Sequence, residues 1–182
     1  FWLKRVGAFD TSFAMVLGFA AWLAAASAPL LNLPQTGVVY GLDFSHDALA
    51  VGSNDGTVTL YHPFSTEGTW APVVKKHGKG VTSVAFNSNG SVLLSTSSNK
   101  TVAAWRVPNG EPVGVYEQPG AVFKVAPNPA NADEFAVACW DGAVRVWSLA
   151  TGAPTTTFSG HTRGVYAVAY SAGGHLLASA SA

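Results

Sequence analysis

Histidine, cysteine and carboxylate side chains are the groups of this sequence that could perform catalysis or bind a metal ion. They are scattered along the chain, and no pair of histidines has metal-ligand spacing with a cysteine or carboxylate beside it. No G-x-S-x-G, H-E-x-x-H or phosphate-binding glycine motif occurs. The sequence therefore predicts no catalytic, cofactor-binding or metal-binding role for its five histidines and one cysteine, which are His46, His62, His77, His161, His175 and Cys139.

The composition predicts a folded chain with little charge. Hydrophobic residues make up 48% of the 182 residues and charged residues 11%, with ten basic side chains balancing ten acidic ones. Such a chain is too apolar to be disordered, and it offers no basic surface for nucleic acid. The single cysteine excludes a disulfide within the chain. We therefore expect protein partners, and neither a nucleic-acid partner nor a small-molecule substrate.

Residues 1–33 form a separate apolar segment. It contains Phe13–Leu31, 19 residues whose only polar side chain is Ser27. A helix of this length would reach about 28 Å, close to the roughly 30 Å apolar thickness of a bilayer. The sequence predicts one membrane-spanning α-helix here, and hence a single-pass membrane protein of an unspecified organelle. A targeting peptide and an apolar helix packed against protein are the alternatives.

Residues 34–182 contain an internal repeat of short β-rich runs separated by turn residues. Its clearest marks are the turns at Asp55, Asn99 and Asp141, which are spaced by 44 and 42 residues. An aromatic residue follows each turn residue after six positions, at Tyr61, Trp105 and Trp147. Four short runs in a unit of this length are typical of one blade of a β-propeller.

These repeats resemble the WD-repeat family. The resemblance rests on Asp141-Gly-Ala-Val-Arg-Val-Trp147 and on the Gly160-His161 pair that follows, with Val165-Tyr-Ala-Val-Ala-Tyr-Ser171 and Leu176-Leu-Ala-Ser-Ala-Ser181 after it. An all-β fold is implied, namely a partial WD-repeat propeller of about three and a half blades behind one apolar helix. The first blade spans Val38 to Val74. The strands expected after it are Val81–Phe86, Val92–Ser97, Thr101–Trp105, Val113–Tyr116, Val122–Ala126, Glu134–Ala138, Ala143–Trp147, Thr155–Phe158, Val165–Tyr170 and Leu176–Ser181.

The resemblance also implies a polar tetrad in each blade, formed by His, Ser or Thr, Asp and Trp. In the second blade these positions hold His77, Ser95, Asn99 and Trp105. The third blade keeps Asp141 and Trp147 but has Gln118 and Val137 at the other two positions, so we expect its network to be broken. The fourth blade supplies His161 and Ser179.

A closed propeller needs more blades than this chain contains. Three explanations are open: the chain is part of a longer protein, another chain supplies the missing blades, or a larger complex covers a short open array.

The candidate partner-binding residues are Trp140, Phe123, Tyr166, Arg163 and Lys79. Trp140 precedes a turn on the face that WD-repeat propellers most often use for partners, and exposed aromatic residues anchor many interfaces. The alternatives are that Trp140 packs against the neighbouring blade, and that Arg163 and Lys79 are ordinary solvated charges.

The leading hypothesis is a non-enzymatic scaffold for protein–protein interaction, anchored in a membrane as an accessory subunit of a multi-protein membrane complex. The alternative is a soluble WD-repeat adaptor whose apolar N-terminal helix docks on a partner protein. A propeller hydrolase or lyase would need clustered carboxylates, whereas Asp43 and Asp133 fall in different blades.

Overall fold

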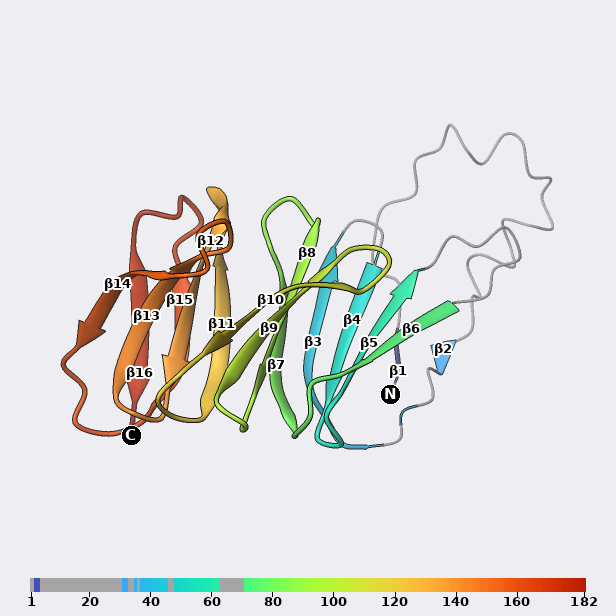
Figure 1. The fold of residues 1–182 in the computed structure, drawn as a ribbon, viewed down its shortest axis with the longest axis horizontal. Coiled ribbons are helices and arrows are strands. Elements are labelled where there is room, and N and C mark those ends of the chain that lie inside the picture. Colours follow the sequence, from blue (N-terminus) through green and yellow to red (C-terminus); the bar gives the residue numbers. More distant parts are fainter. Residues whose placement is uncertain (1, 4–30, 33–34, 36, 46–47, 63–70) are drawn as a thin grey trace. The chain divides into compact units, whose positions relative to one another are not determined.

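The computed structural model describes residues 2–3, 31–32, 35, 37–45, 48–62 and 71–182 (Figure 1). The chain divides into two units, Phe1–Gln35 and Thr36–Ala182. In the first unit the described elements are two short strands, β1 (Trp2–Leu3) and β2 (Leu31–Asn32), which pair antiparallel. All other strands belong to the second unit.

The described part of the second unit consists of three four-stranded antiparallel sheets followed by a two-stranded one. The first blade contains β3 (Val39–Ser45), β4 (Ala48–Ser53), β5 (Thr57–His62) and β6 (Ala71–Lys76). The second contains β7 (Val81–Phe86), β8 (Val92–Ser97), β9 (Thr101–Arg106) and β10 (Glu111–Glu117). The third contains β11 (Val122–Asn128), β12 (Asn131–Cys139), β13 (Ala143–Ser148) and β14 (Pro154–Ser159). The fourth sheet is β15 (Val165–Tyr170) with β16 (Leu177–Ser181). The predicted all-β repeat architecture is thus confirmed for the described residues.

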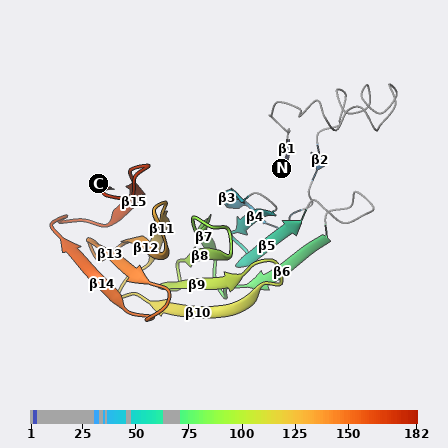
Figure 2. The same cartoon turned by 90° about the horizontal axis from the view of Figure 1, so that it is seen from above.

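The sheets stand side by side with their first strands together. β3, β7, β11 and β15 are successive neighbours on the inner side of the array, and β6, β10 and β14 lie on its outer side (Figure 2). Thr82 in β7 fixes one of these contacts, because its hydroxyl donates to the carbonyl oxygen of Val122 in β11 at 2.7 Å.

The hydrophobic core lies between blades, because each sheet turns its apolar side chains toward the next sheet. Between the second and third blades, Leu94 and Tyr116 pack with Phe135 and Trp147 in one buried cluster. The Tyr116 ring meets both of the other rings edge-on, at centroid distances of 5.1 Å and 5.5 Å. The blades therefore stabilise one another, as expected for a repeat whose single unit cannot bury its own apolar face.

The turns between the second and third strands explain the repeat of Asp or Asn. Asp55, Asn99 and Asp141 each accept a hydrogen bond from the backbone N–H two residues later, at 2.9, 3.2 and 3.1 Å. The intervening residue adopts a positive φ, which favours glycine at positions 56 and 142. At Gly142 a side chain would also come within 2.9 Å of the carbonyl oxygen of His161.

The prediction of a membrane-spanning helix over Phe13–Leu31 is not supported by the described residues. Residues 13–30 lie outside the described residues, but Leu31 lies in β2, where it pairs with Leu3. A residue in an extended antiparallel pair cannot also form the last turn of a helix. Across the described ranges, no helix is long and apolar enough to cross a membrane.

Candidate functional site

One face of the second unit is formed by the loops that enter each blade and the turns between the second and third strands. We call it the loop face and define it by residues 53–56, 77–80, 97–100, 118–121, 139–142 and 160–164; it follows the lower edge of Figure 1. Backbone hydrogen bonds join its segments from blade to blade. The N–H of His77 donates to the carbonyl oxygen of Gly56 at 2.8 Å, and that of Gln118 to the carbonyl oxygen of Lys100 at 2.8 Å.

In the second blade, the structure brings His77, Ser95, Asn99 and Trp105 into one hydrogen-bonded network. The Trp105 indole N–H donates to the Ser95 hydroxyl oxygen at 2.8 Å, and the same oxygen lies 2.9 Å from Nδ1 of His77. Nδ2 of Asn99 donates to the His77 carbonyl oxygen at 3.0 Å. The network therefore ties the loop that enters the blade to its second and third strands.

Thr101 is a fifth member that the sequence analysis missed. Its hydroxyl lies 2.8 Å from Nε2 of His77 and donates to Oδ1 of Asn99 at 2.6 Å. The equivalent Thr57 hydroxyl donates to Asp55 at 2.6 Å, so an Asp or Asn followed two residues later by Thr was the signal available in the sequence.

Hydrogen-bond directions and burial together indicate a neutral His77. Since Thr101 donates to Asn99, Nε2 of His77 donates to Thr101. Nδ1 of the neutral imidazole then accepts from the Ser95 hydroxyl, which also lies 3.5 Å from the Ala103 carbonyl oxygen. Burial lowers the pKa of His77 from 6.5 to about 4, because a second proton would place a charge among partners that already have their hydrogen bonds.

The third blade lacks this network, and the structure shows why. Val137 stands where Ser95 stands in the second blade, and it provides no hydroxyl for Trp147. Nε1 of Trp147 and Oε1 of Gln118 are both buried and have no hydrogen-bond partner among the described residues.

Asp141 instead forms an ion pair with Arg145, with Nη2 and Oδ2 2.6 Å apart. Burial alone would raise the pKa of Asp141, but the hydrogen bonds from Arg145 and from the Ala143 N–H outweigh it and hold that pKa below its ordinary value.

The fourth blade shows part of a network. Nε2 of His161 lies 2.8 Å from the Ser179 hydroxyl oxygen. The equivalent residues of the second blade, His77 and Ser95, meet through Nδ1 of the histidine instead. His161 is half-buried and Ser179 is exposed. The Ser181 hydroxyl donates to the carbonyl oxygens of Arg163 and Gly164 at 3.0 Å and 2.9 Å, which fixes the loop that enters this blade.

The three candidate aromatic residues lie together at the loop face, and we call Phe123, Trp140 and Tyr166 the aromatic patch. Phe123 lies 4.7 Å from Tyr166 and 5.7 Å from Trp140 between ring centroids, and Trp140 lies 6.0 Å from Tyr166. Trp140 is 55% exposed and Tyr166 44% exposed, while Phe123 is partly covered between them. Two large aromatic side chains thus remain open to a partner.

Trp140 also contacts the next blade, as the alternative interpretation expected. Its ring lies against Gly164 so closely that a side chain at that position would come within 2.6 Å of Cε3. The candidate Arg163 directly precedes Gly164, and its side chain is exposed. Lys79 lies in the loop that enters the second blade, where its carbonyl oxygen accepts from Ser97 at 3.1 Å and its side chain is exposed.

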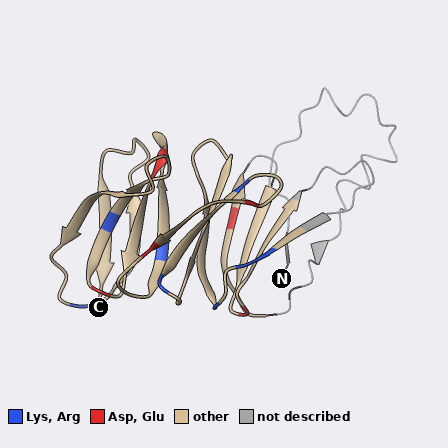
Figure 3. Ribbon diagram, viewed as in Figure 1, with Lys and Arg blue, Asp and Glu red and all other residues tan. Residues whose placement is uncertain are grey.

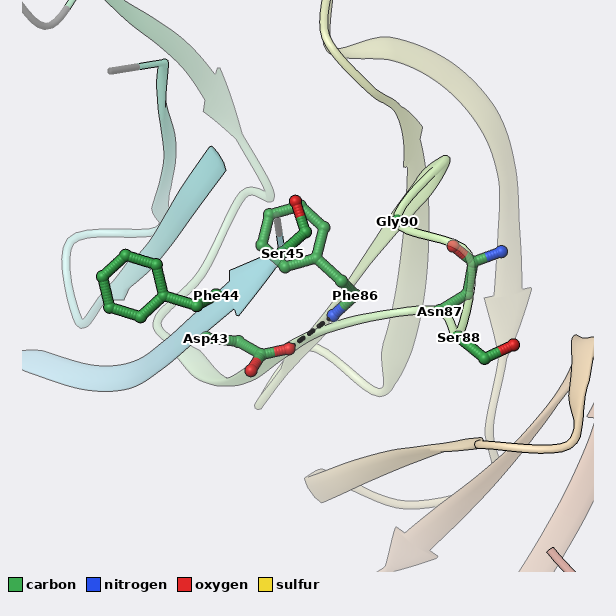
Figure 4. A pocket seen from close by; sticks show the side chains of 7 residues that line it. All are labelled: Asp43, Phe44, Ser45, Phe86, Asn87, Ser88 and Gly90. Atoms are coloured by element: carbon green, nitrogen blue, oxygen red, sulfur yellow. Dashed lines mark hydrogen bonds between the residues drawn. The ribbon is translucent and has the colours of Figure 1, made fainter. Parts of the chain in front are cut away.

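The side chains considered for catalysis, those of Asp43, Asp133 and Cys139, are hydrogen-bonded or buried within the fold. Oδ2 of Asp43 accepts from the Phe86 N–H at 2.7 Å beside a hollow of about 360 Å³ (Figure 4). Asp133 accepts from the Ser148 hydroxyl and the Ala150 N–H at 2.6 Å and 2.7 Å, in a different blade. Cys139 is buried, and burial raises the pKa of its thiol. No group of three potential metal ligands occurs among the residues with described positions.

Ser95→Ala should destabilise the chain by about 3 kcal/mol, because it leaves the buried Trp105 N–H and His77 Nδ1 without their shared partner. Chemical denaturation monitored by circular dichroism measures this change. Ser98→Ala, at an exposed turn position of the same blade, is the matched control and should change stability by less than about 0.5 kcal/mol. Equal effects of the two substitutions would contradict the role assigned to the network.

Stability should fall as the pH drops from 6.5 toward 4. In this range the unfolded chain protonates His77 while the folded chain keeps it neutral, so the folded state binds fewer protons. The full loss is about 3 kcal/mol. Urea unfolding across this range should show a flatter pH dependence for His77→Gln; an unchanged slope would show that His77 does not titrate as described.

Val137→Thr should stabilise the third blade by about 1 kcal/mol. The new hydroxyl would take the place that Ser95 occupies in the second blade, accepting from Trp147 and donating to Gln118, both of which carry an unpaired buried atom. Val137→Ala is the matched control and should only destabilise. A loss of stability for both variants in thermal unfolding would show that the two buried atoms cannot reach this position.

Comparison with known proteins supports the assignment of the repeat. The WD domain, G-beta repeat family matches residues 68–106, 110–148 and 152–182, which together make up more than half of the chain. The chain is 39% identical over 77 residues to eukaryotic translation initiation factor 3 subunit I of Aspergillus terreus, a match covering 42% of this chain and 23% of that protein. It is 37% identical over 89 residues to the retinoblastoma-binding protein 5 homolog of Drosophila melanogaster, covering 49% and 18%.

A longer match, 28% identical over 152 residues, is to the F-box-like/WD repeat-containing protein TBL1X of Mus musculus; it covers 80% of this chain and 27% of that protein. The chain therefore spans about a quarter or less of these three relatives. The predicted single-pass membrane localisation is wrong, since the relatives are named for translation initiation, retinoblastoma-protein binding and an F-box-like region, and Leu31 in the predicted span forms a strand. The three family matches, together with the four-stranded antiparallel sheets, show that this chain belongs to the WD-repeat family.

Proposed function

We propose that this chain is a non-enzymatic scaffold whose loop face binds another protein. The observation that supports this proposal is the aromatic patch, because Trp140 and Tyr166 expose large apolar rings, and the backbone N–H of Trp140 is held by the Ala121 carbonyl oxygen at 2.8 Å. Aromatic anchors of this kind supply much of the binding energy of protein interfaces.

The architecture suits a scaffold better than an enzyme. The carboxylates of Asp43 and Asp133 are held by hydrogen bonds in separate blades, and the Cys139 thiol is buried. The relatives include a protein named as a subunit of a translation initiation factor and one named for binding the retinoblastoma protein. Both names describe assembly with other proteins, and we extend that role to this chain.

The proposed division of labour places binding in residues 34–182. Residues 1–33 form the other proposed domain. The alternative hypothesis, in which an apolar N-terminal helix docks on a partner protein, concerns residues 4–30, which lie outside the described residues. The proposed binding does not require residues 1–33, since every residue of the aromatic patch belongs to the third or fourth blade.

Trp140→Ala should abolish partner binding. We would immobilise the chain, expose it to an extract of its source cells and identify the retained proteins by mass spectrometry. Proteins retained by the wild type should be lost with Trp140→Ala, because the most exposed ring of the patch is gone. Phe158→Ala is the matched control, since Phe158 is 53% exposed but lies on the outer strand β14. Identical sets of retained proteins for the two variants would contradict the proposal.

A further inference from the structure

The aromatic patch is a closed surface rather than a cage. Each of its three rings contacts the other two, and Trp140 is additionally held against Gly164. The space between the rings is filled by the rings themselves, so a cation cannot enter among them as it would enter an aromatic cage. What the patch offers is the outer surface of Trp140 and Tyr166, which suits an apolar side chain laid on top.

The charge next to the patch is positive. Asp141, which follows Trp140 directly, is neutralised by Arg145 in the one ion pair found among the described residues. Arg163, by contrast, has an exposed side chain without an ion pair and adjoins Gly164, on which Trp140 rests. The loop that contacts Trp140 therefore carries a cation for which the described residues provide no ion pair.

Two lysines extend this positive charge along the loop face. Lys79 and Lys100 are exposed and lie in neighbouring segments, because Ser97 donates to the Lys79 carbonyl oxygen while the Lys100 carbonyl oxygen accepts from Gln118. Figure 3 shows both basic and acidic segments along this edge of the ribbon. The acids of this face are Asp55, which is held by Thr57 in the first blade, and Asp141, which is paired with Arg145; Glu117, at the end of β10, borders it. With Asp141 paired to Arg145, the three cations Lys79, Lys100 and Arg163 give the loop face and its border a small excess of positive charge.

We propose that the partner of the loop face is an acidic protein segment carrying one large apolar side chain. The apolar side chain covers Trp140 and Tyr166, and the flanking carboxylates meet Arg163 and, further along, Lys100 and Lys79. The proposal rests on the proposed function and adds the chemistry of the partner. It follows from charge complementarity, because like charges facing each other across an interface oppose binding and opposite charges select the partner.

Three synthetic peptides test this proposal. They share a central Leu-Phe pair and differ only in the flanking residues, which are all Glu, all Lys or all Ser, and each carries fluorescein for anisotropy titration against the full chain. The Glu peptide should bind about tenfold more tightly than the Ser peptide, and the Lys peptide should bind more weakly than either. The preference for Glu should shrink as salt is raised, because the contacts are at an exposed rim.

Charge reversal identifies the cation. Arg163→Glu should remove the preference for the Glu peptide, with a fold-change of about ten in its dissociation constant. Arg106→Glu is the matched control, because Arg106 is exposed at the far end of β9, away from the loop face, and it should leave the preference intact.

A second pair of variants tests the position of the ring without removing it. Gly164→Ala should weaken binding of the Glu peptide, because the added methyl group must displace Trp140. Gly160→Ala lies in the same loop with nothing within 4 Å of the added atom, and it should bind as the wild type does. Circular dichroism of both variants establishes that each remains folded.

Three results would overturn the proposal. Equal binding of all three peptides would mean that the patch docks by apolar contact alone, and tighter binding of the Lys peptide would mean a basic partner. Either result leaves the proposed function standing, provided that Trp140→Ala removes the binding. Failure of all three peptides to bind would overturn the acidic-segment proposal. The proposed function is tested separately, by whether the wild-type chain retains partner proteins that Trp140→Ala does not retain.

Discussion

The hydroxyl group of Ser95 is the small feature on which the described loop face most depends. It accepts from Trp105 and lies within hydrogen-bond distance of His77, so one oxygen joins the second strand, the third strand and the loop that enters the blade. All three groups are buried or partly buried, where an unpaired polar atom is costly. The neutral state of His77, the place of Thr101 and the path of residues 77–80 follow from satisfying these atoms together.

The second and third blades differ in this hydrogen-bonded network. The complete network lies in the second blade, whereas the exposed Trp140 of the aromatic patch lies in the third. The second blade has a complete set of hydrogen bonds, whereas the third leaves Trp147 and Gln118 with unpaired buried atoms. The third blade compensates through packing, since Tyr116, Phe135 and Trp147 form edge-on ring contacts between the two sheets. Its turn then carries Trp140, the most exposed ring of the aromatic patch.

Local patterns made most of the fold predictable. Alternating β-rich runs and the Asp or Asn turns repeat at nearly constant spacing, so the expected strands of the second blade start and end close to β7, β8, β9 and β10. Phe123 and Tyr166 occupy equivalent positions in neighbouring blades, whereas Trp140 was a candidate because it precedes a turn. What could not be predicted depends on contacts between residues distant in sequence, such as the hydrogen bond from the Thr82 hydroxyl to the Val122 carbonyl oxygen. Hydropathy likewise did not reveal that Leu31, the last residue of the expected helix, pairs with Leu3 in a strand; residues 13–30 of that helix lie outside the described residues.

The most direct test of the buried network is hydrogen exchange of the indole N–H groups, followed by NMR on the ¹⁵N-labelled chain. We predict that the Trp105 indole proton exchanges only when the chain unfolds, because it is held by Ser95 inside the blade, while the exposed Trp140 indole exchanges freely. Exchange of the Trp105 proton as rapid as that of Trp140 would mean that the network is not formed in solution, and the loop face would lose the frame described here.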